Sequence, residues 1–154
     1  MLNKTRKLYY PKKYYTGLTV KNKLKRAREI NKNSNIGWNK PEAYNGFTTD
    51  IGIKTKSSRY TNQWNSKFKH AKSLQQKSLA TGVPLKYIKQ SYNRGMAAWR
   101  TGHRPGATQQ QWGYARVHSF LLCGKTYYST DADIVRDATK NSKFAKKWWS
   151  MQNC

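Results

Sequence analysis

The chain has 154 residues, and its 31 Lys and Arg face only 6 Asp and Glu, which gives a formal net charge of +25 at pH 7. Such an excess of cations excludes most metabolic enzymes as a default. Leu, Ile, Val and Phe make up only 23 of the 154 residues, or 15%, and a highly charged chain below about 20% is expected to be disordered.

The aromatic residues oppose this expectation of disorder. The chain contains 6 Trp, 11 Tyr and 4 Phe, and each ring can bury about 150–250 Å² and replace aliphatic side chains in a core. The length allows one domain. We therefore predict a mainly α protein, a small helical domain with an aromatic core and an extended basic N-terminal arm.

Residues 1–17 are the predicted arm. Pro11 disfavours a helical conformation at Tyr10, and Gly17 ends the segment. Aromatic rings alternate with ammonium groups over residues 9–15, a combination suited to base stacking and phosphate neutralisation on single-stranded nucleic acid. Tyrosines would serve equally well in an arm that binds a neighbouring subunit, because each buries apolar area and keeps a polar tip. Both interpretations are open, and both use Tyr10, Lys12, Lys13 and Tyr14.

A basic helix is predicted to follow, with Thr19 as its N-cap and Asn31 near its end. Its apolar stripe is narrow, so only a thin face can be buried, and it is too poor for a membrane surface. The cations around it can bind phosphates or an acidic protein groove, or can simply be solvated. The stripe consists of Val20, Leu24, Ala27 and Asn31, and the candidate polyanion-binding cations are Lys21, Lys25, Arg26 and Arg28.

Residues 32–58 predict a long loop, because glycine and proline interrupt a polar stretch at four positions. A short strand is predicted within it at residues 48–54. The predicted domain organisation places residues 1–58 in the arm, basic helix and loop, and residues 59–154 in the helical domain.

Two amphipathic helices are expected next. Apolar residues recur at helical spacing over residues 59–80 and predict one long helix that Gly82 can end. Pro84 begins a second helix, which continues to Trp99 and stops near Gly102.

A third helix is predicted from Thr108 to about Leu122. Thr108 and Gln111 have the spacing of a capping box, in which a hydroxyl and an amide side chain satisfy each other's backbone N–H groups. Two shorter helices are predicted, one from about Asp131 and one over residues 142–151.

Carboxylates are unevenly distributed. Residues 51–130 contain none, yet they contain 14 Lys and Arg. This stretch cannot neutralise its own charge, so it favours a polyanionic partner or the acidic surface of another protein. The six carboxylates are Glu29, Glu42, Asp50, Asp131, Asp133 and Asp137.

The turn at residues 102–106 is a candidate anion site. It ends where the first backbone N–H groups of the Thr108 helix lack intrahelical partners. Gly106 would let the backbone approach a phosphate or carboxylate closely, and Arg104 could offer two hydrogen bonds. Alternatively the turn is a tight corner in which Arg104 contacts only local carbonyl groups. The candidate anion-binding residues are His103, Arg104, Gly106, Thr108 and Arg116.

The residues needed for catalysis or for a metal are scarce. Metal-dependent phosphoryl chemistry needs converging carboxylates, and although Asp131 and Asp133 resemble a metal pair, the spacing of Thr130 and Asp133 fits a helix cap better. The three histidines match no zinc-binding spacing. A general base could be assembled from His103 with Tyr114 or Arg116 nearby, but the spacing does not require one. We predict no catalytic residues, no metal and no cofactor.

The two cysteines, Cys123 and Cys154, match no metal-binding spacing and predict free thiols in a reducing compartment. No run of 18 apolar residues is present, and no apolar segment follows Met1. The sequence therefore predicts neither a membrane-spanning helix nor a secretory signal.

Residues 81–135 contain AWRTGHRPG, followed by QQWGYARVHSF and GK. This stretch, about a third of the chain, resembles a family of small, basic, functionally uncharacterised proteins encoded by large DNA viruses of algae and protists and by some phages. The resemblance implies a viral source, but it implies no activity and no catalytic residues. It is carried by Gly102, Arg104, Pro105, Trp112, Gly113, Ala115 and Arg116.

Three hypotheses for the function follow. The first is a structural component of a large DNA virus particle, a minor capsid or cement protein that bridges capsid subunits, or the shell and its contents. It would occur in the virion and, during assembly, in the host cytoplasm or viral factory. The second is a sequence-independent nucleic-acid-binding protein that condenses viral DNA, and the third is a phosphodiester-processing enzyme. The expected partners are capsid proteins or acidic protein surfaces, or DNA, without membrane insertion.

Overall fold

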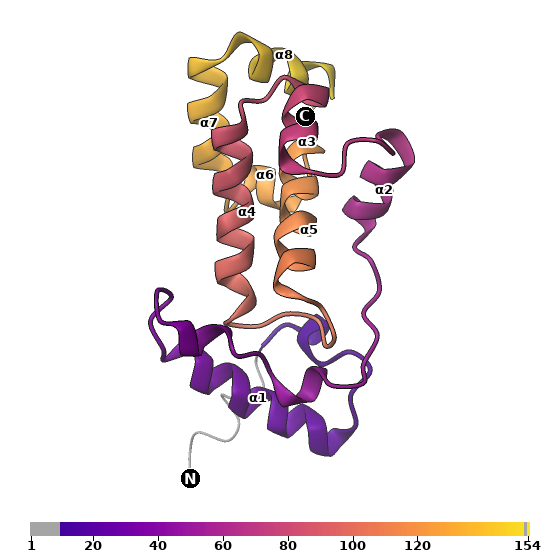
Figure 1. Cartoon of the computed structure of the whole chain (residues 1–154), viewed down its shortest axis with the longest axis vertical. Helices are drawn as coiled ribbons and strands as arrows, with labels where there is room; N and C mark the ends of the chain where they lie inside the picture. The colour runs from indigo at the N-terminus through magenta and orange to yellow at the C-terminus, as the bar shows by residue number, and fades with distance from the viewer. Residues whose placement is uncertain (1–9, 153) are drawn as a thin grey trace. The chain divides into compact units, whose positions relative to one another are not determined.

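The computed structural model describes residues 10–152 and Cys154. Over these residues the chain forms eight α-helices and three short 3-10 helices, and no β-strand (Figure 1). The mainly α prediction is confirmed. The strand predicted at residues 48–54 is wrong, because Thr48–Asp50 forms the 3-10 helix η4. None of the helices in the described residues is long and apolar enough to span a membrane.

The chain divides into two compact units. Unit 1 comprises the residues up to Lys56 together with Met96–Trp112, and unit 2 comprises Ser57–Gly95 and Gly113–Cys154. The predicted boundary at residue 58 lies close to the break after Lys56. Met96–Trp112, however, groups with the N-terminal residues, although the sequence placed it in the C-terminal helical domain.

Helix α1 (Val20–Ser34) is the longest element of unit 1. The Thr19 hydroxyl accepts a hydrogen bond from the backbone N–H of Asn22 at 3.2 Å, which confirms the predicted N-cap. The predicted apolar stripe is largely wrong, because Val20 is 77% exposed and Leu24 is 48% exposed. The buried residues of α1 are Arg26, Ala27, Ile30 and Asn33.

The segment from Tyr10 to Gly17 is not an extended arm. It contains the 3-10 helix η2 (Lys12–Tyr15), in which the Tyr14 N–H donates to the Pro11 carbonyl at 2.9 Å. Proline restricts the residue before it, but its own fixed φ is suited to opening a helical turn. Residues 1–9 of the predicted arm lie outside the described residues. The apolar cluster around η2 consists of Tyr15, Ala27, Ile30 and Phe47, with Tyr10 and Tyr14 packed against it.

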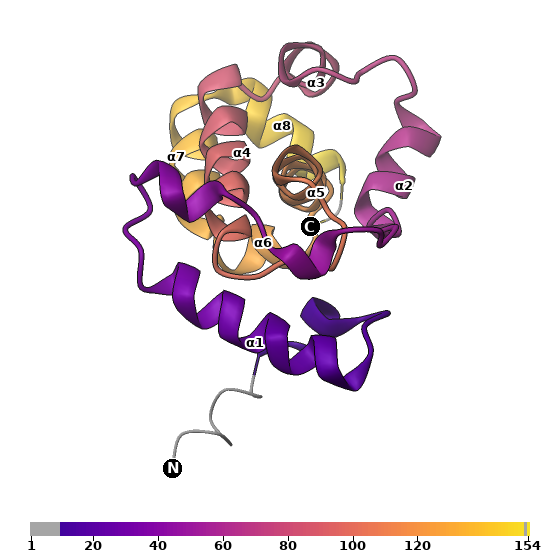
Figure 2. The same ribbon diagram turned by 60° about the horizontal axis from the view of Figure 1, so that its bottom comes forward.

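Helices α2 to α8 follow, and the pair α7 and α8 is in contact in unit 2 (Figure 2). Helices α4 and α5 are shared between the two units, because the last four residues of α4 and the first four of α5 group with unit 1. Helix α6 was not predicted. The bounds are α2 Arg59–Lys67, α3 Leu74–Thr81, α4 Leu85–Trp99, α5 Gln109–Leu121, α6 Lys125–Tyr128, α7 Ala132–Asn141 and α8 Lys143–Met151.

The long helix predicted over residues 59–80 is two helices, α2 and α3. Ser73 begins the second with a capping box, since its hydroxyl accepts from the Gln76 N–H at 3.1 Å and the Gln76 side chain accepts from the Ser73 N–H at 3.0 Å. Leu79, which the periodic pattern placed on the buried stripe, is 80% exposed. Gly82 ends α3 in the left-handed conformation with φ 83°, as predicted.

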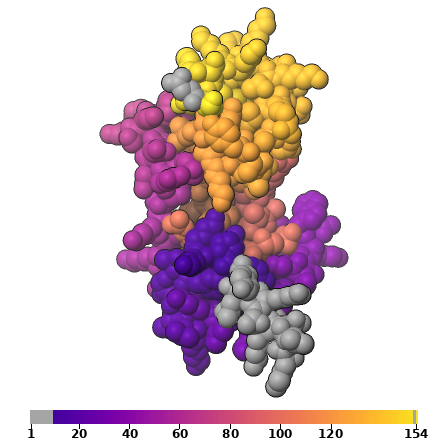
Figure 3. All heavy atoms as spheres, turned by 180° about the vertical axis from the view of Figure 1, so that it is seen from behind, coloured from indigo at the N-terminus to yellow at the C-terminus, as the bar shows by residue number. Residues whose placement is uncertain are grey.

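The core of unit 2 is aromatic, as the composition predicted. The indole N–H of Trp64 donates to the Ala71 carbonyl at 2.9 Å, and that of Trp148 donates to the Leu121 carbonyl at 2.8 Å. Each buried tryptophan therefore keeps a partner for its polar atom. Helices α6 to α8 form the orange to yellow surface of this unit in Figure 3. Buried core residues include Trp64, Tyr87, Ile88, Phe120, Ile134, Trp148 and Trp149.

Helix α7 begins differently from the prediction. Asp131 is its N-cap and makes no side-chain cap hydrogen bond, so the predicted cap by Thr130 and Asp133 is wrong. Asp131 is fully buried and lies 2.7 Å from the Arg116 guanidinium. Asp133 forms two hydrogen bonds with Arg94, at 2.7 and 2.8 Å. In the structure both carboxylates bind guanidinium groups instead.

The two cysteines are not free thiols. Cys123 and Cys154 form a disulfide bond, with their Cα atoms 5.5 Å apart, and they are separated by 31 positions in sequence. The prediction of free thiols was wrong because neither residue has a local signal for its partner, and only the fold of unit 2 brings them together.

Reducing this disulfide is expected to lower the free energy of unfolding by about 3–4 kcal/mol, because the loop closed by Cys123 and Cys154 would regain its conformational freedom in the unfolded chain. Urea unfolding with and without a phosphine reductant measures the effect. The Cys154→Ser variant should show the same loss without reductant and no further loss with it. Equal stability of the oxidised and reduced chain would contradict the prediction.

Candidate functional site

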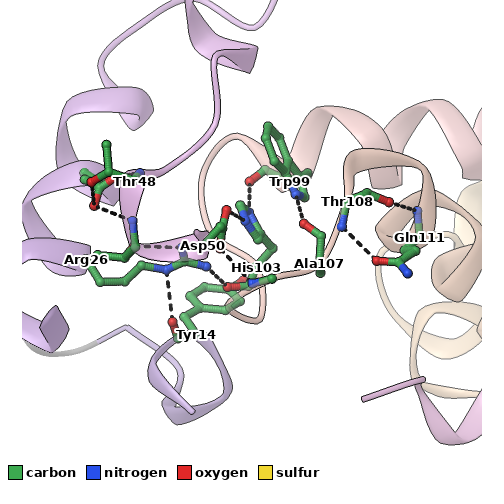
Figure 4. Close-up of polar contacts among 12 residues, drawn as sticks. Tyr14, Arg26, Thr48, Asp50, Trp99, His103, Ala107, Thr108 and Gln111 are labelled. Atoms are coloured by element: carbon green, nitrogen blue, oxygen red, sulfur yellow. Dashed lines mark hydrogen bonds and ion pairs between the residues drawn. The ribbon is translucent and has the colours of Figure 1, made fainter. Parts of the chain in front are cut away.

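The predicted anion-binding turn holds a carboxylate of the chain itself (Figure 4). Asp50, the last residue of η4, accepts a hydrogen bond from the Gly106 N–H at 2.9 Å through Oδ1. Its Oδ2 lies 2.7 Å from Nε2 of His103, and Nη1 of Arg26 lies 2.6 Å from Oδ1. An external phosphate at this turn would therefore have to displace Asp50. We call Arg26, Asp50, His103 and Gly106 the Asp50 centre.

His103 is fully buried, and each of its two ring nitrogens lies within hydrogen-bond distance of an oxygen. Nδ1 is 2.7 Å from the Trp99 carbonyl, which can only accept a hydrogen bond, so Nδ1 is protonated. Nε2 faces Oδ2 of Asp50 at 2.7 Å. The ring is stacked between Trp99, at 4.4 Å, and Phe47, at 4.9 Å. His103 is therefore a structural residue, closed to any substrate.

Opposing effects act on the pKa of Asp50. Burial raises it, but the hydrogen bond and charge of His103, the Gly106 N–H and the charge of Arg26 outweigh burial and bring it below its usual value. Asp50 is thus a carboxylate at neutral pH and completes a buried ion-pair network.

Arg26 was predicted to neutralise phosphates of a polyanion, and the structure corrects this. Its side chain is fully buried and donates to the Tyr14 carbonyl at 3.1 Å and to the Thr49 hydroxyl at 3.0 Å, in addition to Asp50 and the His103 carbonyl. The sequence contained a signal for the burial of Arg26. Arg26 and Ile30 are four residues apart, so they lie on the same face of α1.

Glu29 fixes the position of η4 next to α1. Its carboxylate accepts hydrogen bonds from the Thr48 N–H at 2.6 Å and the Thr49 N–H at 3.3 Å. Because η4 carries Asp50, this contact positions the carboxylate of the Asp50 centre. Helix α1 is held to η4 through both Glu29 and Arg26.

The other predicted anion-binding residues do not converge. Thr108 and Gln111 form the expected capping box, at 3.1 and 2.9 Å, which occupies the Thr108 amide. Arg104 is half-buried, and its side chain makes no hydrogen bond or ion pair within the described part of the chain. Arg116 belongs to unit 2, where it binds Asp131.

The remaining predicted cations lie on the surface of unit 1. Lys12 and Lys13 on η2 are exposed, and Lys13 lies 5.4 Å from the Trp112 ring centre. The segment with η2 and the start of α1 appears in indigo on the face shown in Figure 3. Four exposed cations share one face of α1, because their spacing is four, three and four residues. They are Lys21, Lys25, Arg28 and Lys32, and we call them the α1 cation row.

Lys32 was missed in the sequence, although its position eleven residues after Lys21 is a helical repeat. Carboxylates do not compensate the row, because the ion pairs of the described residues join Arg26, Arg94 and Arg116 to Asp50, Asp131 and Asp133. Half of the six carboxylates are used in this way.

Unit 2 contains a buried lysine and a buried histidine that the sequence did not single out. Nζ of Lys77 donates to the Ala71 carbonyl at 2.6 Å and lies 5.0 Å from the Trp64 ring centre, and burial lowers its pKa to about 8. His118 is 3% exposed, and its Nδ1 lies 2.9 Å from the Thr61 hydroxyl. Burial, and secondly the charge of Lys77, lower the pKa of His118 to about 3, so the ring is neutral at pH 7.

Among the described residues, no group of three His, Cys, Asp or Glu side chains could hold a metal ion.

The structure defines a small, strongly basic protein, helical over its described residues, in which three of the six carboxylates pair with guanidinium groups. The chain belongs to a family of unknown function, DUF5824, whose model matches residues 11–143 and so extends over parts of both units. No curated protein and no solved structure shows a significant match. The family match gives no activity, and the resemblance to viral proteins is still a prediction.

Proposed function

We propose that the protein is a sequence-independent nucleic-acid-binding protein that contacts phosphates with the α1 cation row. The observation that carries the proposal is the separation of charge within unit 1. Asp50 is half-buried and paired with the fully buried Arg26, whereas Lys21, Lys25, Arg28 and Lys32 are exposed on one face of the same helix. A row of uncompensated cations is the usual means of binding a phosphate backbone.

The geometry of the row suits a polyanion. Lys21 and Lys32 are eleven residues apart, which is about 16 Å along an α-helix. Glu29 and Arg26 hold the helix to η4, so the row is presented on a fixed element. A fixed row loses less conformational freedom on binding than a flexible basic tail.

The structure does not favour the other two hypotheses. Tyr10, Tyr14 and Tyr15 pack within unit 1, which counts against a bridging arm and equally against base stacking by these rings, so the proposal rests on the cation row alone. A phosphodiester-processing enzyme would need an accessible His103, and this ring is buried between Trp99 and Phe47. A capsid or cement role is still a prediction, as is a location in the virion.

The test is the salt dependence of binding to a fluorescent 20-base-pair DNA. If the row contacts four phosphates, it should contribute about −3.6 to the slope of log K against log salt, or about 100-fold in affinity between 50 and 200 mM salt. Replacing all four cations by glutamine should remove this contribution. A second DNA of unrelated sequence should bind equally well.

The matched control replaces four exposed lysines of unit 2 by glutamine and leaves the row intact. It changes the net charge by the same amount, so a larger loss in the row variant assigns the contact to α1. No salt-dependent binding, or equal losses in the two variants, would contradict the proposal. The control lysines are Lys140, Lys143, Lys146 and Lys147.

A further inference from the structure

Trp38, in the loop after α1, is a tryptophan open to solvent. All six tryptophans lie within the described residues, and Trp38 is the only one that is largely exposed, at 66%. We propose that its ring stacks on an unpaired base, so that the protein binds single-stranded nucleic acid more tightly than a duplex. This inference rests on the proposed nucleic-acid binding and names the form of nucleic acid that the same surface prefers. The buried or half-buried tryptophans are Trp64, Trp99, Trp112, Trp148 and Trp149.

The indole ring of Trp38 is free to meet a ligand. Within the described part of the chain its side chain takes part in no aromatic pair, no cation–π contact and no hydrogen bond. By contrast, the indole N–H groups of Trp64 and Trp148 donate to backbone carbonyls inside unit 2. Tryptophan is usually well buried, because its large ring gains much from leaving water. A base can therefore cover the Trp38 ring without breaking an existing contact.

The backbone that carries Trp38 is fixed. The Tyr44 hydroxyl donates to the Trp38 carbonyl at 2.6 Å, and the Lys40 N–H donates to the Gly37 carbonyl at 2.9 Å. A ring on a hydrogen-bonded turn loses less conformational freedom on binding than a ring on a flexible loop. Trp38 is thus presented on a preorganised segment.

Trp38 lies beyond the end of α1 at which the cation row stops. Lys32 is the last cation of the row, and Trp38 follows six residues later in the same unit. The chain turns after the helix, because the Asn35 N–H donates to the Lys32 carbonyl at 3.2 Å. Six residues span at most about 20–22 Å even when extended. A single strand that occupies about 4–16 nucleotides can therefore contact both the row and Trp38.

The charges beside Trp38 favour a phosphate backbone. Lys40 is exposed, and its Cγ would lie 3.5 Å from a Cβ atom placed on Gly37, so its stem lies against the same turn. Residues 30–49 contain two lysines and one carboxylate, Glu42. An exposed aromatic ring among cations is the combination with which proteins bind single strands without sequence preference.

An apolar protein surface or a membrane could also use an exposed tryptophan, but the surroundings of Trp38 favour neither. A protein interface places such a ring among further apolar side chains, whereas Asn39 and Lys40 beside it are exposed and hydrophilic. A membrane surface needs the ring on the apolar face of an amphipathic helix. The exposed apolar residues of α1, Val20 and Leu24, lie in its first two turns, and Trp38 follows its last residue.

The experiment measures the affinity of the full chain for three fluorescent ligands at fixed salt. They are a thymidine strand of about 16 nucleotides, an abasic strand of the same length and a duplex of the same length. Trp38→Ala should weaken binding of the thymidine strand by about 5- to 100-fold, the range for stacking on one base. The abasic strand has no base and the duplex has its bases already stacked, so both affinities should stay within about twofold.

Three controls separate stacking from other effects. Trp38→Phe keeps an aromatic ring and should restore most of the affinity for the thymidine strand. Ile51→Ala removes apolar surface from a residue of unit 1 that is 79% exposed, and it should leave all three affinities unchanged. The urea midpoint of Trp38→Ala should equal that of the unmodified chain, because an exposed ring contributes little to stability.

Equal losses for the thymidine and abasic strands in Trp38→Ala, or no loss for either, would overturn the stacking site. Trp38-dependent binding of vesicles of phosphatidylserine and phosphatidylcholine, with the thymidine strand unaffected, would assign the ring to a membrane surface instead.

The two proposals can fail separately. If glutamine substitution of the row lowers DNA affinity and Trp38→Ala does not discriminate between the ligands, the proposed function stands and the stacking site is wrong. If Trp38→Ala weakens only the thymidine strand and the row variant loses no more than its control, the ring is a nucleic-acid contact and the row is not.

Discussion

Replacing Asp50 by alanine is expected to lower the free energy of unfolding by about 3–5 kcal/mol. The carboxylate accepts from Arg26, His103 and the Gly106 N–H, at 2.6, 2.7 and 2.9 Å. Arg26 and His103 are fully buried. Without Asp50 the charge of Arg26 would be left uncompensated inside unit 1, which is the condition under which breaking a buried ion pair costs most.

Urea unfolding followed by circular dichroism measures this loss, and Asp137→Ala is the control. Asp137 is exposed on α7, so its substitution should change stability by no more than about 0.5 kcal/mol. Arg26→Met combined with Asp50→Ala should cost less than the sum of the single changes, because the two residues share one interaction. Similar losses for Asp50→Ala and Asp137→Ala would show that the Asp50 centre contributes little.

Local signals in the sequence predicted most helix ends. Thr19 and Thr108 cap their helices, and Gly82 ends α3, because each acts through backbone groups within a few residues. Ser73 and Gln76 form an equally local capping box at the start of α3. The apolar periodicity over residues 59–80 continues through these two residues, and it predicted one long helix instead of two. At this position the capping box indicates the start of a helix better than the periodicity does.

Contacts distant in sequence could not be predicted in this way. Arg26 is buried because Asp50, 24 residues later, lies beside it, and nothing in the pattern of α1 indicates that partner. The disulfide joins Cys123 to Cys154, 31 residues apart. Both pairings depend on how the helices pack, which composition and periodicity do not specify.

At the candidate site, the residue types of the turn indicated that it could contact an anionic group. They did not indicate which group would lie there. Gly106 and His103 were selected as an anion site, and they do contact a carboxylate. The sequence could not show that the carboxylate would be Asp50, since Glu29 brings η4 to α1 through tertiary contacts. Exposed cations such as Lys21 and Lys25 were selected correctly as surface residues, because helix periodicity places them opposite the buried face.

Acid is expected to destabilise unit 2 through His118. The ordinary pKa of histidine, 6.5, applies in the unfolded chain, whereas the pKa is about 3 in the fold. Between these values the unfolded chain binds a proton that the folded chain does not, so stability falls as the pH falls through this range. The slope approaches about 1.4 kcal/mol per pH unit, and the full loss approaches about 4–5 kcal/mol.

The interval from pH 6.5 to 4.5 isolates this effect, because carboxylates such as Asp50 titrate mainly below it. The free energy of unfolding should fall by about 2–3 kcal/mol there, and His118→Gln should remove most of the slope. The physical cause is burial, since a charged ring would lie against Trp64, at 5.7 Å, with Lys77 nearby and no partner for Nε2 among the described residues. Equal slopes in the two proteins would mean that His118 is already protonated in the fold, which its burial at 3% exposure argues against.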